Sequence, residues 1–286
     1  MCSPLVEKIV RERIQKEGLP NFSRRNFLKL GGVAAGGLAA ASLIPQRKAQ
    51  AQTAAMGVTD LSHIFATEMP TYTLGETPTR EPFVTVEANG FFIQRWTLYE
   101  HAGTHVDFPA HFIADGETVD IYPVENLLGP AVVIDIAERA AEDPDTMVMP
   151  EDLDAWESAN GEIPAGAIVC MYSGWESRWS SIQDFRNPDA DGVMHFPGFG
   201  PEAAEWLLAE RDIYGIAVDT LSLDPGNSTT FDVHVAICSA GKFGIENIAN
   251  LSSIMNNQAS IFVGIPRWQG SGGGPSRIVA FHAADM

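Results

Sequence analysis

One stretch of the chain constrains its fold more than any other. It reads His101-Ala-Gly-Thr-His105-Val-Asp107-Phe-Pro-Ala-His111-Phe112. The first histidine, the second and the aspartate are four and then two residues apart, and side chains an even number of residues apart on a strand point to the same face. A helix would turn the aspartate away from the two histidines, and the glycine, threonine and proline within the stretch disfavour a helix. The motif therefore predicts an extended segment that directs His101, His105 and Asp107 into one pocket.

Two neutral imidazoles and a carboxylate form a ligand set that suits zinc, manganese or iron and leaves room for a water molecule. A divalent cation lowers the pKa of a bound water from about 15.7 toward 7 and polarises a carbonyl group, so the set indicates hydrolysis. His111 follows a proline bend after the predicted strand. An imidazole titrates near neutrality, so His111 can take a proton from water and pass it to a leaving group. A hydrogen bond to a ligand residue is the alternative role for His111.

Residues 1–51 have the pattern of a cleavable export signal. A twin-arginine segment, Ser23 to Lys29, precedes an uncharged run over 30–44 and a small-residue site that ends at Ala51. The uncharged run is short and poor in Leu and Ile for a transmembrane helix, which needs about 20 apolar residues. The alternatives are a chance succession of basic and apolar residues and an uncleaved anchor. We expect export through the twin-arginine machinery, a periplasmic location, and no membrane association after cleavage.

The remaining residues, 52–286, carry 9 Lys and Arg and 34 Asp and Glu, a net charge of −25. Such acidity argues against binding to nucleic acid or to anionic membrane surfaces. Their number is compatible with one domain, and we predict a hydrolase domain over 52–286. Cys170 and Cys238 each lie in an apolar run and are predicted to be buried thiols.

The hydrophobic pattern predicts a mixed α/β or α+β domain, since strands outnumber helices and helices recur between them. Residues 231–237 fit a helix and a strand equally well, and the glycine-rich stretch 270–276 is predicted to be a flexible turn next to the pocket. Strands are expected at 60–63, 83–87, 91–99, 131–136, 167–172, 215–220, 261–265 and 277–282, and helices from 149 and over 200–211.

Further candidates for the site are weaker when taken one at a time. His234 precedes Glu246 by twelve residues, and Asp219 ends a predicted strand, where it could support a ligand or cap a turn. The turn that ends at Trp175 could direct side chains toward a pocket. His63, His195 and His282 are expected to be core residues. The sequence contains neither the Gly-x-Ser-x-Gly motif of serine hydrolases nor a phosphate-binding loop.

Residues 101–112 fit His-x-Gly-Thr-His-x-Asp-x-Pro-x-His-Phe at every fixed position, and the chain resembles the bacterial cyclase family of metal-dependent hydrolases, which includes kynurenine formamidase and isatin hydrolase. The resemblance covers about residues 58–282 and implies a swivelling β/β/α fold and a homodimer or larger homo-oligomer. Further matching segments are Asp60–His63, Tyr172–Trp175, Phe196–Gly198, Asp219–Gly226 and Gly244–Asn247.

The resemblance also implies a role for each site residue. One or two divalent ions, zinc or manganese, would be bound, with Asp107 as the bridging ligand where there are two. The implied ligands are His101, His105 and Asp107 for the first metal, and His234 and Glu246 for the second. His111 matches the catalytic histidine. Tyr72 falls near a position where the formamidase type has a substrate-contacting tryptophan, and Trp175 is a second candidate for substrate contact.

These observations predict hydrolysis of a small amide, formamide, lactam or lactone, by an enzyme that resembles an arylformamidase. One alternative is an isatin hydrolase-like ring-opening enzyme with a single metal. Another is a periplasmic binding protein that holds metal without turnover. Tryptophan breakdown takes place in the cytoplasm, and an exported enzyme would be an unusual participant in it. A substrate other than N-formylkynurenine is therefore plausible.

Overall fold

The computed structural model describes residues 56–255 and 258–283. The predicted export signal, 1–51, lies outside the described residues. The described chain divides into two compact units, a hairpin over Thr79–Thr97 and a body made of residues 56–78 and 98–283. Among the described residues, no helix has the length and apolar character needed to cross a bilayer.

The body is built on one nine-stranded sheet with the order β1-β13-β11-β5-β7-β9-β10-β4-β12. Its strands are β1 (Met56–Asp60), β4 (His105–Asp107), β5 (Leu128–Asp135), β7 (Ile168–Tyr172), β9 (Gly215–Val218), β10 (Phe243–Glu246), β11 (Ser260–Gly264), β12 (Gly273–Pro275) and β13 (Arg277–Ala283). The four central strands, β5, β7, β9 and β10, are parallel, and the remaining pairs are antiparallel. The carboxyl ends of the parallel strands therefore meet at one edge, where ligands commonly bind in such sheets.

Helices connect the parallel strands, as the long crossover between parallel neighbours requires. They are α5 (Ala137–Glu142), α6 (Pro150–Asn160), α7 (Ile182–Arg186), α8 (Pro201–Glu210) and α9 (Asp232–Ser239). A short parallel pair, β6 (Met147–Val148) with β8 (Gly198–Phe199), lies within the crossovers. Single 3-10 turns complete the body: η1 (Pro109–His111), η2 (Val124–Leu127), η3 (Trp175–Arg178) and η4 (Leu251–Ser253).

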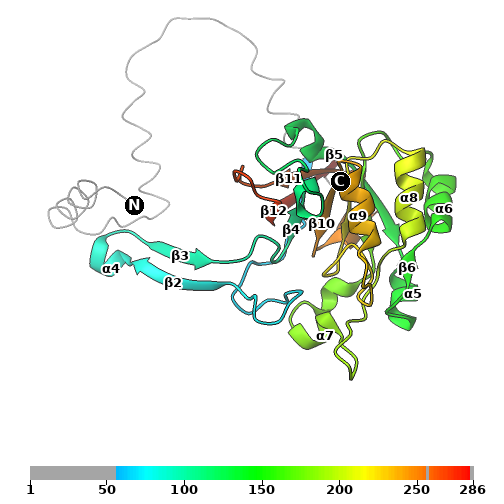
Figure 1. Ribbon diagram of the computed structural model, residues 1–286. Coiled ribbons are helices and arrows are strands. Elements are labelled where there is room, and N and C mark those ends of the chain that lie inside the picture. Colours follow the sequence, from blue (N-terminus) through cyan, green and yellow to red (C-terminus); the bar gives the residue numbers. More distant parts are fainter. Residues whose placement is uncertain (1–55, 256–257, 284–286) are drawn as a thin grey trace, which may run out of the picture. The chain divides into compact units, whose positions relative to one another are not determined.

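The two faces of the sheet bury separate apolar clusters. On one face, α6, α8 and α9 pack on the central strands through residues such as Leu153, Leu207 and Ile237 (Figure 1). The cluster on the other face joins Val106 of β4 to Ile278 of β13, which lie near opposite ends of the strand order. The sheet therefore curls around this second cluster, and the predicted mixed α/β class is confirmed.

Local signals explain why the predicted helices form where they do. Pro150 and Pro201 stand at the first turns of α6 and α8, where proline costs no hydrogen bond. Asp152 accepts a hydrogen bond from the Met149 backbone N–H at 2.8 Å and closes the start of α6. In the segment 231–237, which fitted a helix and a strand equally well, Phe231 is the N-cap and residues 232–237 belong to α9.

The hairpin unit is formed by β2 (Thr79–Val84) and β3 (Ile93–Thr97), with a short helix, α4 (Val86–Asn89), at the turn. The strand expected at 83–87 was displaced toward the turn, since β2 begins at Thr79 and residues 86–89 form α4, and the strand expected at 91–99 was two residues too long at each end. Phe83, Val86 and Phe92 are exposed on this unit.

The glycine-rich stretch contains a strand where a flexible turn was expected. Gly273 pairs with Asp107 in antiparallel register, so β12 flanks the strand that carries the histidine motif. A Cβ atom on Gly273 would lie 2.3 Å from the Val106 carbonyl oxygen and 2.5 Å from the His101 ring. The close approach of the two strands thus depends on glycine, which pattern reading associates with turns.

Replacement of Gly273 by Ala is expected to lower the free energy of unfolding by about 1–3 kcal/mol, because overpacking forces the two backbones apart. Chemical denaturation of the variant checks this. Asp154→Ala on the exposed side of α6 serves as the control and should stay within about 0.5 kcal/mol of the parent. Equal midpoints for Gly273→Ala and the parent would contradict the packing argument.

Candidate active site

Strand register brings the first site residues together. In the antiparallel pair of β4 and β10, His105 lies opposite Glu246, and Asp107 lies opposite Gly244. Residues directly opposite in such a pair share a face, as do residues two apart on one strand. His105, Asp107 and Glu246 therefore project from one face, and all three are buried. The predicted extended conformation is confirmed for His105 and Asp107.

His101 reaches the same place by another route. His101 lies in a bend before β4. The motif had predicted that it would be part of the extended segment, and this prediction is wrong. Gly103 has a φ of +65°, a conformation that glycine adopts without steric cost, and it reverses the chain between the two histidines. The Nδ1 atom of His101 lies 2.5 Å from Oδ1 of Asp107.

The hydrogen bonds of His105 identify its free nitrogen. Its Nδ1 faces the Gly103 carbonyl oxygen at 2.8 Å, which can only accept, so the ring proton lies on Nδ1. Nε2 lies 3.3 Å from carboxylate oxygens of both Asp107 and Glu246. Nε2 of His105 and Oδ2 of Asp107 are buried without a hydrogen-bond partner. Lone pairs that face one another in this way fit a cation between them.

His234 enters from the first turn of α9. Its Nε2 lies 3.1 Å from Oε1 of Glu246 and 3.4 Å from Oδ2 of Asp107, and its Nδ1 lies 2.6 Å from Oδ2 of Asp224. Asp224 also accepts hydrogen bonds from the backbone N–H groups of Val233 and His234, at 2.9 and 3.2 Å. One carboxylate therefore holds both the start of the helix and the orientation of the ring.

The pKa values report how strongly this cluster favours positive charge. Burial lowers the pKa of His105, but the carboxylates of Asp107 and Glu246 raise it by a larger amount, so that the resulting pKa is about 10. Burial likewise opposes the charge on His234, yet Asp107, Asp224 and Glu246 hold its pKa well above the ordinary value. Burial raises the pKa of Asp107, and the surrounding histidines lower it well below its usual range. Two buried carboxylates of this kind need cations, which protons or a metal ion can supply.

The donor set fits a divalent metal. His101, Asp107 and His111 offer ligand atoms within 4.8 Å of one another, and so do His105, Asp107 and Glu246. Asp107 belongs to both groups, as expected for a bridging ligand. Imidazole nitrogens and carboxylate oxygens are donors that zinc and manganese both accept. The described residues could thus hold one or two ions.

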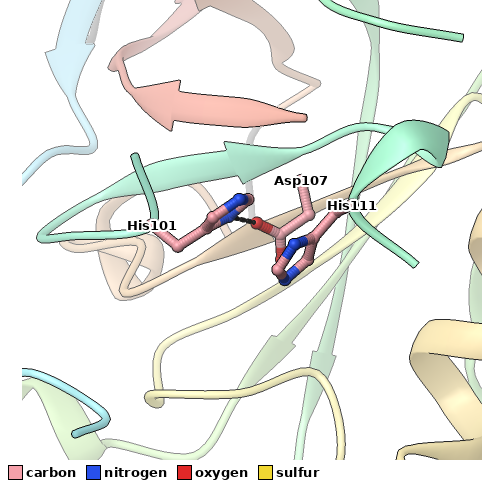
Figure 2. Close-up of side chains that lie close together, drawn as sticks. All are labelled: His101, Asp107 and His111. Carbon is pink, nitrogen blue, oxygen red and sulfur yellow. Dashed lines mark hydrogen bonds and ion pairs between the residues drawn. The ribbon is translucent and has the colours of Figure 1, made fainter. Parts of the chain in front are cut away.

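His111 lies beside the ligand cluster at the end of η1. Its ring stacks on His101 with a centroid distance of 3.6 Å and an interplanar angle of 20°, and Figure 2 shows both rings next to Asp107. The residue as a whole is exposed, but its stacked ring is desolvated, and this lowers its pKa to about 4. A neutral imidazole at pH 7 can accept a proton, as a general base must.

A cavity of about 510 Å³ opens onto the cluster. Its walls include the aromatic side chains of Tyr72, Phe112 and Phe231. Among the described lining residues, Glu76 and Glu100 contribute the carboxylates other than that of Glu246. No lysine or arginine lines it among residues 56–255 and 258–283. A pocket with apolar walls and a few convergent polar groups is the usual form of a small-molecule site.

Of the other three residues considered for the site, Tyr72 lies at the cavity, and Trp175 and Asp219 do not. Tyr72 lines the cavity, and its carbonyl oxygen accepts a hydrogen bond from Arg186 of α7. Trp175 is 2% exposed and does not line the cavity; its indole N–H donates to the Phe185 carbonyl oxygen at 2.8 Å. Asp219 accepts hydrogen bonds from Ser173 and from the Trp175 backbone, so it caps that turn rather than supporting a ligand.

Sequence reasoning assigned no role to Asp224, Phe112 or Phe231. Asp224 lies in the matched segment Asp219–Gly226, but the sequence alone does not tell which of its two aspartates reaches His234. Phe112 closes the histidine motif, and its ring stacks on His234 at 4.6 Å. Phe231 lies three residues before His234, a spacing that becomes informative only once the segment is known to start a helix.

Comparison with known proteins shows which family the chain resembles in sequence and fold. A model of the Cyclase family matches residues 59–225. Isatin hydrolase of Roseibium aggregatum is 34% identical over 200 residues, which cover 66% of this chain and 75% of that protein. The structure of isatin hydrolase A from Ralstonia solanacearum has a TM-score of 0.76 at 30% identity and covers 85% of this chain and 99% of its own. An isatin hydrolase bound to the product analogue thioisatinate has a TM-score of 0.77 at 25% identity, with 92% and 100% covered.

Asp224→Asn is expected to weaken metal affinity by about 10–100-fold, because the carboxylate that orients His234 becomes a neutral amide. Isothermal titration of the metal-free protein with zinc or manganese measures the effect. Asp154→Asn, which removes the same charge from the exposed side of α6, is the matched control and should bind metal like the parent. An affinity of Asp224→Asn equal to that of the control would show that His234 needs no such support.

Proposed function

The chain belongs to the cyclase family of hydrolases, and on that premise we propose that it opens a neutral aromatic cyclic amide of the isatin type by metal-dependent hydrolysis. One observation carries the proposal: the cavity joins a buried His/Asp/Glu donor set to apolar aromatic walls and contains no lysine or arginine among its described lining residues. The isatin hydrolase of Roseibium aggregatum, at 34% identity, supports the same class of substrate.

We propose His101, His105, Asp107, His234 and Glu246 as the metal ligands, with zinc or manganese as the ion. A divalent ion in this place would polarise the substrate carbonyl, and it would lower the pKa of water so that hydroxide is available for attack at neutral pH. The residues around it fix the donor atoms. Gly103 and Asp224 each hold one ring nitrogen of a ligand histidine, so the opposite nitrogen faces the carboxylates.

His111 is proposed to move the proton. Its neutral ring takes a proton from the attacking water as oxygen adds to the carbonyl carbon of the cyclic amide. When the carbon–nitrogen bond breaks, the same ring returns the proton to the departing nitrogen. The product is a carboxylic acid and a free aromatic amine, and when the acid ionises at neutral pH one proton is released to solvent.

The charge of the cavity favours a neutral substrate. A compound that bears a carboxylate would find no lysine or arginine among the described lining residues and would face Glu76 and Glu100. A neutral lactam avoids this repulsion before the reaction. Ring opening creates a carboxylate in the product, and repulsion between this carboxylate and the side chains of Glu76 and Glu100 favours release of the product.

We further propose a periplasmic location, export by the twin-arginine machinery, and a homodimer. The Arg24–Arg25 pair supports export. Cell fractionation of a variant with both arginines replaced by lysine tests the proposal, and we expect this variant to be retained in the cytoplasm.

The hairpin of β2 and β3 supports the proposed homodimer. Its side chains Phe83, Val86 and Phe92 are exposed and support contact with a second chain, because an isolated hairpin is marginally stable in water. Light scattering that finds only monomer at micromolar concentration would contradict the dimer.

His105→Ala and His111→Ala are expected to separate metal binding from proton transfer. His105→Ala should lose metal, since one buried donor is gone. His111→Ala should keep its metal and lose about 10²–10⁴-fold in turnover, the usual contribution of a general base. Metal analysis and isatin hydrolysis on the same samples provide both measurements, with His282→Ala as a control outside the cavity. Full activity of metal-loaded His111→Ala would exclude its assigned role, and a metal-loaded parent inert toward every amide and lactone offered would favour a binding protein.

The neutral-substrate proposal predicts that isatin is hydrolysed with a kcat/KM about tenfold or more above that of isatin bearing a carboxylate on its benzene ring. Two unit charges about 10 Å apart repel by about 1.7 kcal/mol at an effective dielectric constant of 20, and 1.4 kcal/mol corresponds to tenfold. Replacing Glu76 and Glu100 by glutamine should narrow the ratio. Equal values for the two compounds, or faster hydrolysis of N-formylkynurenine, would contradict the assignment.

A further inference from the structure

Phe231 has a backbone conformation that its residue type rarely adopts. Its φ and ψ are +54° and +43°, in the left-handed region. The other non-glycine residues of positive φ in the described chain are all asparagine or aspartate, whose short polar side chains tolerate this region. A bulky aromatic residue does not, so the surrounding structure must hold Phe231 in place.

The ring of Phe231 lies at the cavity. Its centroid is 6.0 Å from that of Tyr72, 5.9 Å from that of Phe112 and 5.9 Å from that of His234. All four residues line the same cavity. The three aromatic rings, which we call the aromatic wall, thus border the donor set at His234.

The backbone alone does not account for a phenylalanine here. The left-handed turn starts α9 and brings the N–H groups of Val233 and His234 to Asp224. Glycine or asparagine would make this turn with less steric conflict. A residue that is unfavourable for the backbone and whose side chain lines the cavity indicates that the ring itself has a use.

We propose that Phe231 is a specificity-determining residue that recognises the fused benzene ring of the substrate. This inference rests on the proposed function and sharpens it: the aromatic wall selects aryl-fused cyclic amides over aliphatic ones of the same ring chemistry. Flat rings pack favourably against Tyr72, Phe112 and Phe231 through buried area and aromatic contacts. The donor set and His111 act on the α-keto amide, which both kinds of compound share.

The test compares isatin with pyrrolidine-2,3-dione, which keeps the five-membered α-keto lactam and lacks the benzene ring. Phe231→Gly removes the ring and suits the left-handed backbone. We expect its KM for isatin to rise about 10–100-fold, while the KM for pyrrolidine-2,3-dione, or its inhibition constant as a competitor of isatin, changes less than twofold. The thermal midpoint should not fall, because glycine relieves the backbone conflict.

Two further variants isolate the ring. Phe231→Tyr keeps an aromatic ring and should retain the preference for isatin, whereas Phe231→Leu keeps an apolar side chain and should lose most of it. Asn187→Gly, a replacement at another left-handed position outside the cavity lining, is the matched control and should change neither constant. An unchanged ratio of the two constants in Phe231→Gly would overturn the inference while leaving the hydrolase assignment intact. Failure of the metal-loaded parent to hydrolyse isatin would instead refute the proposed function.

Discussion

The candidate site depends on one buried carboxylate. Asp107 is fully buried, and its oxygens face His101, His105 and His234. Burying an isolated charge of this kind costs several kcal/mol unless positive groups surround it. With Glu246 added, the cluster contains two acids within a few ångströms, and a divalent ion balances both while leaving the imidazoles neutral. Asp107 thereby explains why the chain brings three histidines from two distant segments to one place.

The sheet makes this convergence possible. The parallel strands end at one edge, and the antiparallel addition of β4 to β10 places the start of β4 opposite the end of β10. Glu246 is the last residue of its strand and His105 the first of its own, so register alone joins them. β12 then pairs along the other side of β4 and can approach closely because Gly273 has no side chain. The donor set is therefore held by backbone hydrogen bonds on both sides, which is the rigid support that metal ligands require.

Those features that depend on neighbouring residues could be predicted from the sequence. His105 and Asp107 lie two residues apart, and the alternation of side chains along a strand was sufficient to predict that they share a face. The helix α8 was predicted from the proline at its start and from its apolar side. His234 and Glu246 are brought to the motif by tertiary packing, and only family resemblance connected them in advance. The helix at 232–239 could not be assigned because its apolar residues fit both periodicities. Trp175 was expected at a pocket because it follows a strand end, but Asp219 turns that loop inward and the indole joins the core.

The first turn of α9 couples the polar half of the site to the apolar half. Phe231 contributes to the aromatic wall, and His234, three residues later, contributes to the donor set. The left-handed start of the helix costs about 1–2 kcal/mol, and the three hydrogen bonds that Asp224 accepts from Val233 and His234 offset it. A hydrogen bond to a charged group contributes about 1.5–3 kcal/mol, so the balance favours the turn. Because Asp224 holds both the turn that follows Phe231 and the ring of His234, the position of the Phe231 ring is tied to the position of a ligand.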